Sequence, residues 1–230
     1  MDEPSRMTRL FSSTAPADWL QQPGPGQPGQ PGQPGQPGWP GDFDILDPRP
    51  EQIHLSDIAH GLAGKFRFAG QSPIRKTVAR HSLEVADRCM APIAKVWGLF
   101  HDAAEAYLGD IPTPHKRSIW FFGDGMGNGT SLTGVEMNLL AAIAARFHLP
   151  WPIPPDIAAE VHAADARALE LDQRTLWYDF DVDGGEKMAM LPESGRVCHD
   201  RAAWLVAACE AVAEMRRIHH GDTENEKRGG

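Results

Sequence analysis

Beyond residue 41, apolar residues recur at spacings of three and four, which is typical of amphipathic helices packed on a core. Apolar and polar residues do not alternate for more than a few positions, so no strand is predicted. We expect six helices, over residues 56–63, 77–89, 92–109, 136–147, 155–178 and 201–218, with long loops at 123–134 and 181–195. Six helices without a strand predict an all-α, bundle-like domain.

The third predicted helix is apolar nearly all round, which marks it as the central helix. His101 and Asp102 interrupt it, and a buried polar or charged group is costly unless a partner compensates it. His81 lies among the apolar positions of the second helix, and Asp165 lies on or beside the buried stripe of the fifth. We therefore expect these four side chains to satisfy one another, or a common ligand, inside the domain.

The dipeptide His-Asp is weak evidence by itself, because chance alone gives about one copy in a chain of this composition and the chain contains two. The second copy, His199-Asp200, precedes the last predicted helix, where Asp200 is expected to act as the N-cap. The first copy differs in its surroundings, since it lies within an apolar helix. Only His101-Asp102 therefore indicates a functional site.

The helical spacing suggests how these residues could meet. Adjacent positions on a helix diverge by about 100°, so His101 and Asp102 can converge on one ion lying between them. Glu105 then lies one turn further along, close to that ion. His81 and Asp165 are the candidates for the remaining two ligands.

Two imidazoles and two carboxylates form a ligand set of intermediate hardness, suited to Mn²⁺, Fe²⁺, Co²⁺, Ni²⁺ or Zn²⁺. Mg²⁺ is also open. If Asp165 is not a ligand, Asp172 is the next candidate. The sequence thus predicts one divalent metal ion held by residues of three helices.

Residues 1–41 differ in composition from the rest of the chain. They hold nine of the 20 prolines, and the triplet Gly-Gln-Pro repeats between residues 26 and 38. Such a segment cannot bury enough apolar surface to offset the entropy of ordering it, so we expect a disordered tail and linker. We expect one folded domain over residues 42–220, and a disordered C-terminal tail over residues 221–230.

The net charge of −9 disfavours binding to a nucleic acid polymer. Residues 58–83 nevertheless contain no acid and five basic residues, which favours a small anionic ligand. No apolar run is long enough to span a membrane or to act as a secretory signal. The three cysteines include no C-x-x-C pair, which argues against a disulfide framework. We expect a cytoplasmic protein, and the sequence leaves a homo-oligomer open.

Several motifs together resemble those of the HD-domain metal-dependent phosphohydrolases. The resemblance extends over about residues 43–176. Within this family, the chain is similar to the branch that includes bacterial 5′-deoxynucleotidases and phage dATP triphosphohydrolases. Its elements are SDIAH at 56–60, RF at 67–68, VARHS at 78–82, FHDAAE at 100–105, GDIPTP at 109–114, Lys116, and AD at 164–165.

This resemblance implies a role for each matching residue. His81, His101, Asp102 and Asp165 would hold the metal, with Asp102 also belonging to the catalytic group. Glu105 would be the catalytic carboxylate, and Arg67 would orient the phosphate with its guanidinium fork. The substrate side would be formed by Phe68, Asp110, Ile111, Pro112, Thr113 and Lys116. Phe68, Arg80 and the loop at 123–133 depart from the pattern of the bacterial nucleotidases, which affects the choice of substrate.

The resulting expectation is an enzyme, a nucleotide phosphohydrolase that converts deoxyribonucleoside 5′-monophosphates to deoxynucleoside and phosphate. The alternative within the same class is a dNTP triphosphohydrolase that releases triphosphate, for which Arg75, Lys76, Arg80, Lys116 and Arg117 could supply cations. An alternative of another class is a non-catalytic nucleotide-binding module. The sequence leaves the base preference and the native metal open.

Overall fold

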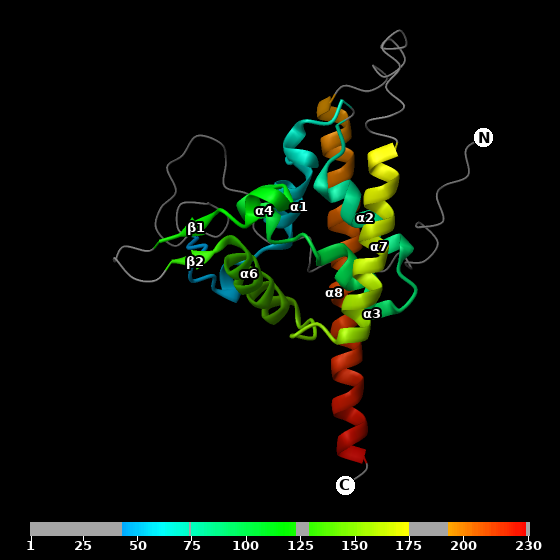
Figure 1. Ribbon diagram of the computed structural model, residues 1–230. Coiled ribbons are helices and arrows are strands. Elements are labelled where there is room, and N and C mark those ends of the chain that lie inside the picture. Colours follow the sequence, from blue (N-terminus) through cyan, green and yellow to red (C-terminus); the bar gives the residue numbers. More distant parts are fainter. Residues whose placement is uncertain (1–42, 74, 123–128, 175–192, 229–230) are drawn as a thin grey trace, which may run out of the picture.

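A computed structural model describes residues 43–73, 75–122, 129–174 and 193–228, with the backbone alone at 193–196 and 219–228 (Figure 1). The helices are α1 (Leu55–Ala63), α2 (Val78–Arg88), α3 (Pro92–Phe100), α4 (Glu105–Leu108), α5 (Thr113–Lys116), α6 (Leu132–Phe147), α7 (Pro155–Gln173) and α8 (Glu193–Arg228). Two 3₁₀ helices, η4 (Pro50–Gln52) and η5 (Phe68–Gly70), accompany them. The expected N-terminal tail, residues 1–41, lies outside the described residues.

The all-α fold predicted from the periodicity is confirmed, with one small addition. Strands β1 (Trp120–Phe121) and β2 (Thr130–Ser131) pair antiparallel, where the sequence predicted no strand. They are too short for an alternating pattern to reveal them. None of the helices in the described part of the chain is long and apolar enough to cross a membrane.

The first two helices follow the sequence closely. Thr77, at the predicted start of the second helix, is the N-cap of α2, and its hydroxyl accepts a hydrogen bond from the amide of Arg80. The N-cap of α1 is His54, whose side chain makes no capping hydrogen bond, and α1 begins one residue before the predicted start at Ser56.

The third helix is shorter than predicted, and its break lies at the His-Asp pair. α3 ends at Phe100, residues 101–104 form a turn, and α4 begins at Glu105. The amide of Ala103 donates to the carbonyl of Phe100, and that of Glu105 donates to the carbonyl of Asp102. These hydrogen bonds join residues i and i+3, as in a 3₁₀ helix, so the chain is wound more tightly here than in an α-helix. Gly109, with a positive φ of 91°, ends α4 where the sequence predicted an end.

The last three helices differ at their ends. α6 begins at Leu132, capped by Ser131, four residues before the predicted start at Glu136. The predicted end of α7 near Tyr178 lies outside the described residues. α8 begins at Glu193, so Asp200 is not an N-cap, and the helix continues to Arg228 through most of the expected C-terminal tail.

The core is centred on α3, as its apolar surface predicted. Trp97, Phe100 and Trp204 are fully buried, and full burial of such side chains stabilises a fold by about 1.5–3 kcal/mol each. The rings of Phe100 and Trp204 meet edge to face with centroids 5.4 Å apart. Helices α2, α3, α7 and α8 pack along one another, whereas α6 and the hairpin lie to one side (Figure 1).

Helices α2 and α3 approach closely at Gly98. A Cβ atom at this position would lie 2.9 Å from the Cα of Ala86 and 3.2 Å from the Sγ of Cys89. The absent side chain lets the two backbones meet, and it brings the end of α3 against α2. This contact positions the turn that carries the His-Asp pair.

Candidate metal centre

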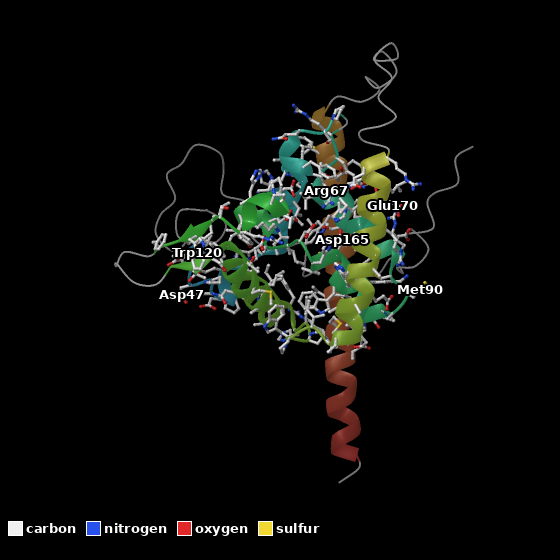
Figure 2. All side chains as sticks on the ribbon, viewed as in Figure 1. Asp47, Arg67, Met90, Trp120, Asp165 and Glu170 are labelled. Carbon is white, nitrogen blue, oxygen red and sulfur yellow. The ribbon has the colours of Figure 1, made fainter. Side chains whose placement is uncertain are left out.

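Four candidate ligands converge from three parts of the fold. His81 lies on α2, His101 and Asp102 lie in the turn after α3, and Asp165 (labelled in Figure 2) lies on α7. The Nε2 atom of His81 is 3.0 Å from Oδ1 of Asp165 and 3.6 Å from Oδ2 of Asp102. The Nε2 atom of His101 is 3.2 Å from that Asp102 oxygen and 4.0 Å from the Asp165 oxygen.

The donor atoms of this group are placed as a metal ion would need them. One ligand atom from each of His81, His101 and Asp165 lies within 4.8 Å of the others, so this group could hold a metal ion. Asp102 adds a carboxylate oxygen at the same place. The Nε2 atoms of both histidines are buried and have no hydrogen-bond partner among the described residues. Bare imidazole nitrogens beside two carboxylates fit a divalent transition metal.

The main chain fixes the orientation of His101. Its Nδ1 atom is 2.8 Å from the carbonyl oxygen of Gly98, which can only accept, so Nδ1 carries the proton. The lone pair of Nε2 is then directed at the two carboxylates. A histidine that donates its other N–H to a carbonyl is a common arrangement at metal sites.

Burial and the close charges shift the pKa values of this group. Burial lowers the pKa of His81, although Asp165 opposes the shift. Burial acts in the same direction on His101, but the carboxylate of Asp102 outweighs it and raises the pKa of His101. Burial raises the pKa of a carboxyl, but at Asp102 His101 outweighs this effect, and at Asp165 His81 does. The pKa of each carboxyl is therefore lowered. The two carboxylates are therefore ionised at neutral pH.

A second layer of charges lies on the other side of His81. The carboxylate of Asp172 is 1% exposed, and its Oδ1 atom accepts a hydrogen bond of 2.5 Å from Nζ of Lys76. Its Oδ2 atom is 3.4 Å from Nε of Arg67 and 3.8 Å from Nδ1 of His81. A terminal nitrogen of Arg67 also lies 3.6 Å from the carboxylate of Asp102, one of the four candidate ligands. Asp172 thus lies behind His81 instead of among the converging donors.

Glu105 lies at the start of α4 and is 6% exposed. Burial, together with the nearby charges of Asp102 and Asp110, raises its pKa to about 9. Its Oε1 atom is 3.6 Å from Nζ of Lys116, and its buried Oε2 atom has no hydrogen-bond partner among the described residues. This carboxyl is therefore protonated at neutral pH in the metal-free protein.

A cavity of about 110 Å³ adjoins both Glu105 and the candidate ligands. Lys116 lies on one side of it, held at 2.7 Å from the carboxylate of Glu136 on α6. The lining combines polar and charged groups with the apolar side chains of Met137 and Leu140 on α6. Its lining is His101, Asp102, Ala104, Glu105, Lys116, Thr133, Glu136, Met137 and Leu140.

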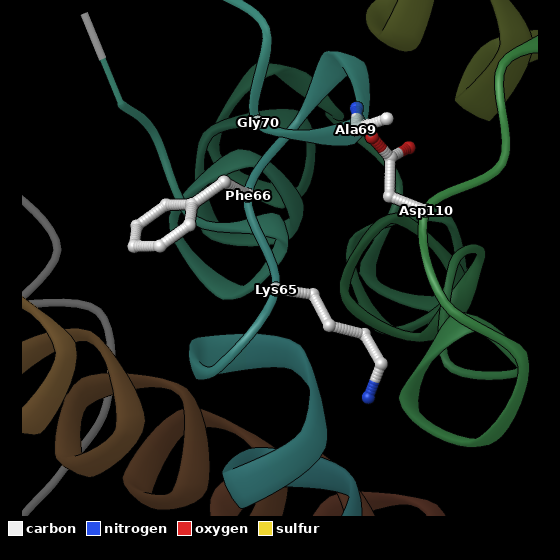
Figure 3. Close-up of a pocket in the computed structure, with 5 residues that line it drawn as sticks. All are labelled: Lys65, Phe66, Ala69, Gly70 and Asp110. Carbon is white, nitrogen blue, oxygen red and sulfur yellow. Dashed lines mark hydrogen bonds between the residues drawn. The ribbon is translucent and has the colours of Figure 1, made fainter.

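The loop after Arg67 has a strained backbone. Phe68, Ala69 and Gly70 all have positive φ values, of 58°, 53° and 71°. The carboxylate of Asp110 accepts a hydrogen bond of 2.8 Å from the amide of Ala69 and holds this conformation (Figure 3). A second cavity of about 220 Å³ lies here, lined by Lys65, Phe66, Ala69, Gly70 and Asp110.

The structure brings most of the residues singled out from the sequence to one place. Arg67 contacts Asp102, and Glu105 and Lys116 line the cavity that adjoins His101 and Asp102. The guanidinium of Arg67 lies 5.5 Å from the ring centre of Phe68. Ile111, Pro112 and Thr113 do not line either cavity, and Asp110 lines only the second one.

Sequence reasoning missed the partners of these residues. Glu136 occupies a helix position typical of a solvated acid, Asp172 was named only as a substitute metal ligand, and Lys76 only as a cation for a triphosphate. No local signal distinguishes them, because their partners are at least 20 residues away in sequence. The pairs become visible only in the fold, which brings Lys76 to Asp172 on α7 and Lys116 to Glu136 on α6.

Comparison with known proteins gives relatives without a stated activity. No family model matches the chain. An uncharacterized protein of Rhodobacter capsulatus is 37% identical over 137 residues, which cover 56% of this chain and 65% of that protein. The uncharacterized protein YfdR of Escherichia coli is 30% identical over 129 residues, which cover 56% of this chain and 64% of that protein. The chain thus matches slightly less than two thirds of each relative.

Proposed function

We propose that this chain is a metal-dependent phosphohydrolase of the HD-domain type, acting on nucleotides in the cytoplasm. The observation that carries the proposal is the convergence of four donors, two of them bare imidazole nitrogens, beside a cavity lined by Glu105 and Lys116. His81, His101, Asp102 and Asp165 are the proposed ligands. A divalent ion bound there would lower the pKa of a coordinated water and polarise a phosphoryl oxygen.

Lys116, Arg67 and Glu105 would each have a separate role at the phosphate. Lys116 supplies a positive charge at the cavity, and Arg67 supplies one beside Asp102, so both can neutralise the non-bridging oxygens. Glu105 carries a proton at neutral pH in the metal-free protein, which suits it to protonate the leaving 5′-oxygen. Met137 and Leu140 add apolar surface to the cavity lining, which suits contact with the nucleoside.

The pairing of the cations favours a monophosphate substrate over a triphosphate. Lys76 is bound to Asp172 and Glu84, and Arg80 to Glu84, so two of the cations named for a triphosphate are already paired. A triphosphate carries up to three more negative charges and needs cations that are not already neutralised. We therefore propose deoxyribonucleoside 5′-monophosphates as substrates, with inorganic phosphate and the deoxynucleoside as products.

A product assay on the full chain tests this proposal. The protein is incubated with each deoxynucleoside monophosphate and triphosphate, in the presence of Mn²⁺, Co²⁺ or Mg²⁺, with His199→Ala as the active control and Asp102→Ala as the inactive one. We expect inorganic phosphate from the monophosphates. Tripolyphosphate from dATP, with dAMP unchanged, would replace the monophosphatase with a triphosphohydrolase. Nucleotide binding without turnover under any metal would favour the non-catalytic module.

A further inference from the structure

Asp172 is a buried charge that the proposed chemistry leaves unused. Its side chain is almost completely buried, and a carboxylate in such a place is costly unless it is paired. Lys76 and Arg67 supply two positive partners, but the second oxygen of Asp172 makes no hydrogen bond among the described residues. This oxygen lies between the guanidinium of Arg67 and the imidazole of His81.

The geometry of α7 explains why Asp172 can reach His81 from behind. Asp165 and Asp172 are seven residues apart, so they lie on the same face of the helix, offset by about 20° and two turns along the axis. The His81 ring lies between them, with Nε2 3.0 Å from Asp165 and Nδ1 3.8 Å from Asp172. One helix thus supplies a carboxylate to each nitrogen of the same ring.

We propose that Asp172 is a positioning residue that keeps the proton of His81 on Nδ1 and leaves Nε2 free to bind the metal. The proposal rests on the metal site of the proposed function. The carbonyl of Gly98 performs this task for His101, whereas Nδ1 of His81 makes no hydrogen bond among the described residues and has the carboxylate of Asp172 3.8 Å away. Carboxylates that accept from a metal-binding histidine fix its tautomer and increase its basicity.

Asp172 also fixes the position of Arg67. The guanidinium contacts Asp172 through Nε and Asp102 through a terminal nitrogen. It therefore connects Asp172 to one of the four candidate ligands. A carboxylate that merely neutralised Lys76 and Arg67 would need no particular relation to the imidazole. The experiments below separate these two roles.

The first experiment uses the unaltered full chain, with ¹⁵N-labelled histidine, in the metal-free and Zn²⁺-bound states. Chemical shifts and one-bond couplings report which ring nitrogen of His81 carries the proton, and His101 provides an internal reference. We expect Nδ1–H with a bare Nε2 for His81. A proton on Nε2 of neutral His81 in the metal-free protein would overturn the proposal without any substitution.

The second experiment compares two variants that differ only in the acceptor. Lys76→Met keeps the carboxylate of Asp172, whereas the double variant Lys76→Met with Asp172→Leu removes it and restores the net charge of the wild type. Metal affinity is measured with Zn²⁺ by competition against a chromophoric chelator. We expect the single variant to bind as tightly as the wild type or more tightly, and the double variant to bind 10–100-fold more weakly.

Circular dichroism and a cooperative thermal transition establish that both variants fold. A folded double variant with wild-type affinity for Zn²⁺ would reduce Asp172 to a structural ion pair. The outcome is independent of the substrate: a chain that binds Zn²⁺ as expected but hydrolyses no nucleotide would contradict the proposed function alone. If the double variant does not fold, the tautomer of His81 in the wild type decides the question.

Discussion

The chain contains the same dipeptide in two environments. His101 and Asp102 lie in the turn after α3, with side chains 14% and 20% exposed. His199 and Asp200 lie in α8, where the imidazole is 72% exposed and the carboxylate 12% exposed. Asp200 accepts a hydrogen bond of 2.7 Å from the hydroxyl of Thr77, the N-cap of α2. The second pair is therefore complete within the protein.

The difference lies in which atoms still need a partner. At the first pair, Nε2 of His101 is buried without a hydrogen bond, and the nearest groups are carboxylates that also approach His81. At the second pair, water reaches the histidine and a hydroxyl satisfies the aspartate. Unsatisfied buried groups, and not the dipeptide itself, distinguish the candidate site.

The most severe test of this comparison is to remove each histidine. His101→Ala should abolish binding of the metal, because a four-ligand site seldom survives the loss of one ligand, and kcat should fall with it. His199→Ala should leave both unchanged. Metal content by inductively coupled plasma mass spectrometry decides the matter, and equal occupancy in the two variants would erase the distinction between the pairs.

Glu105, which follows the first pair, should matter for turnover and not for metal. Glu105→Gln removes the proposed proton donor and should lower kcat by roughly 10²-fold or more, while metal content and KM change little. Steady-state kinetics on deoxynucleoside monophosphates provide the measurement. A variant with wild-type kcat would exclude Glu105 from the chemistry.

The raised pKa of Glu105 should make the stability of the folded protein depend on pH. The pKa of Glu105 is raised to about 9 in the folded protein, so between its unfolded value and 9 the folded state holds a proton that the unfolded state has lost. The free energy of unfolding of the metal-free wild type should therefore fall with rising pH, relative to Glu105→Gln, by on the order of 1 kcal/mol per pH unit. Urea titrations with a chelator present, from pH 5 to 8, measure this difference. Parallel curves for the two proteins would contradict it.

The second pair should affect stability alone. Asp200→Ala leaves the buried hydroxyl of Thr77 without its acceptor, at a cost of about 1–3 kcal/mol in the free energy of unfolding. Metal content should stay at the wild-type level. His199→Ala, on the exposed side of the pair, should change stability by less than about 0.5 kcal/mol. Loss of metal in Asp200→Ala would show that the two pairs are not independent.

Much of this architecture could be predicted from the apolar periodicity. It indicated six helices, the central position of α3 and the inward direction of His81, because these depend on which face of a helix is apolar. It missed the break at His101, since Ala103 and Ala104 remain buried in the turn and continue the apolar pattern. The prediction that His101 and Asp102 lie on a continuous helix was wrong, although the turn still brings both toward the same atoms.

The partners across the fold could not be predicted in this way. Asp200 was interpreted as a cap because it precedes an apolar run, but α8 begins earlier and Thr77 explains its burial. Asp172 lies near the end of a helix among polar residues, and only Lys76 and Arg67, about 100 residues earlier, make its burial intelligible. Long-range pairs of charges leave no periodic signal in a single chain.

The glycine at position 98 has a consequence for how this chain can vary. It allows α2 and α3 to meet, and its carbonyl orients the imidazole of His101, whose ring centre lies 5.3 Å from that of His81. Any side chain there would separate the helices that carry the two imidazoles. A genetic screen for variants that keep all four proposed ligands yet no longer retain the ion should therefore recover Gly98→Ala. At this site a residue with no side chain would be as intolerant of mutation as the histidines.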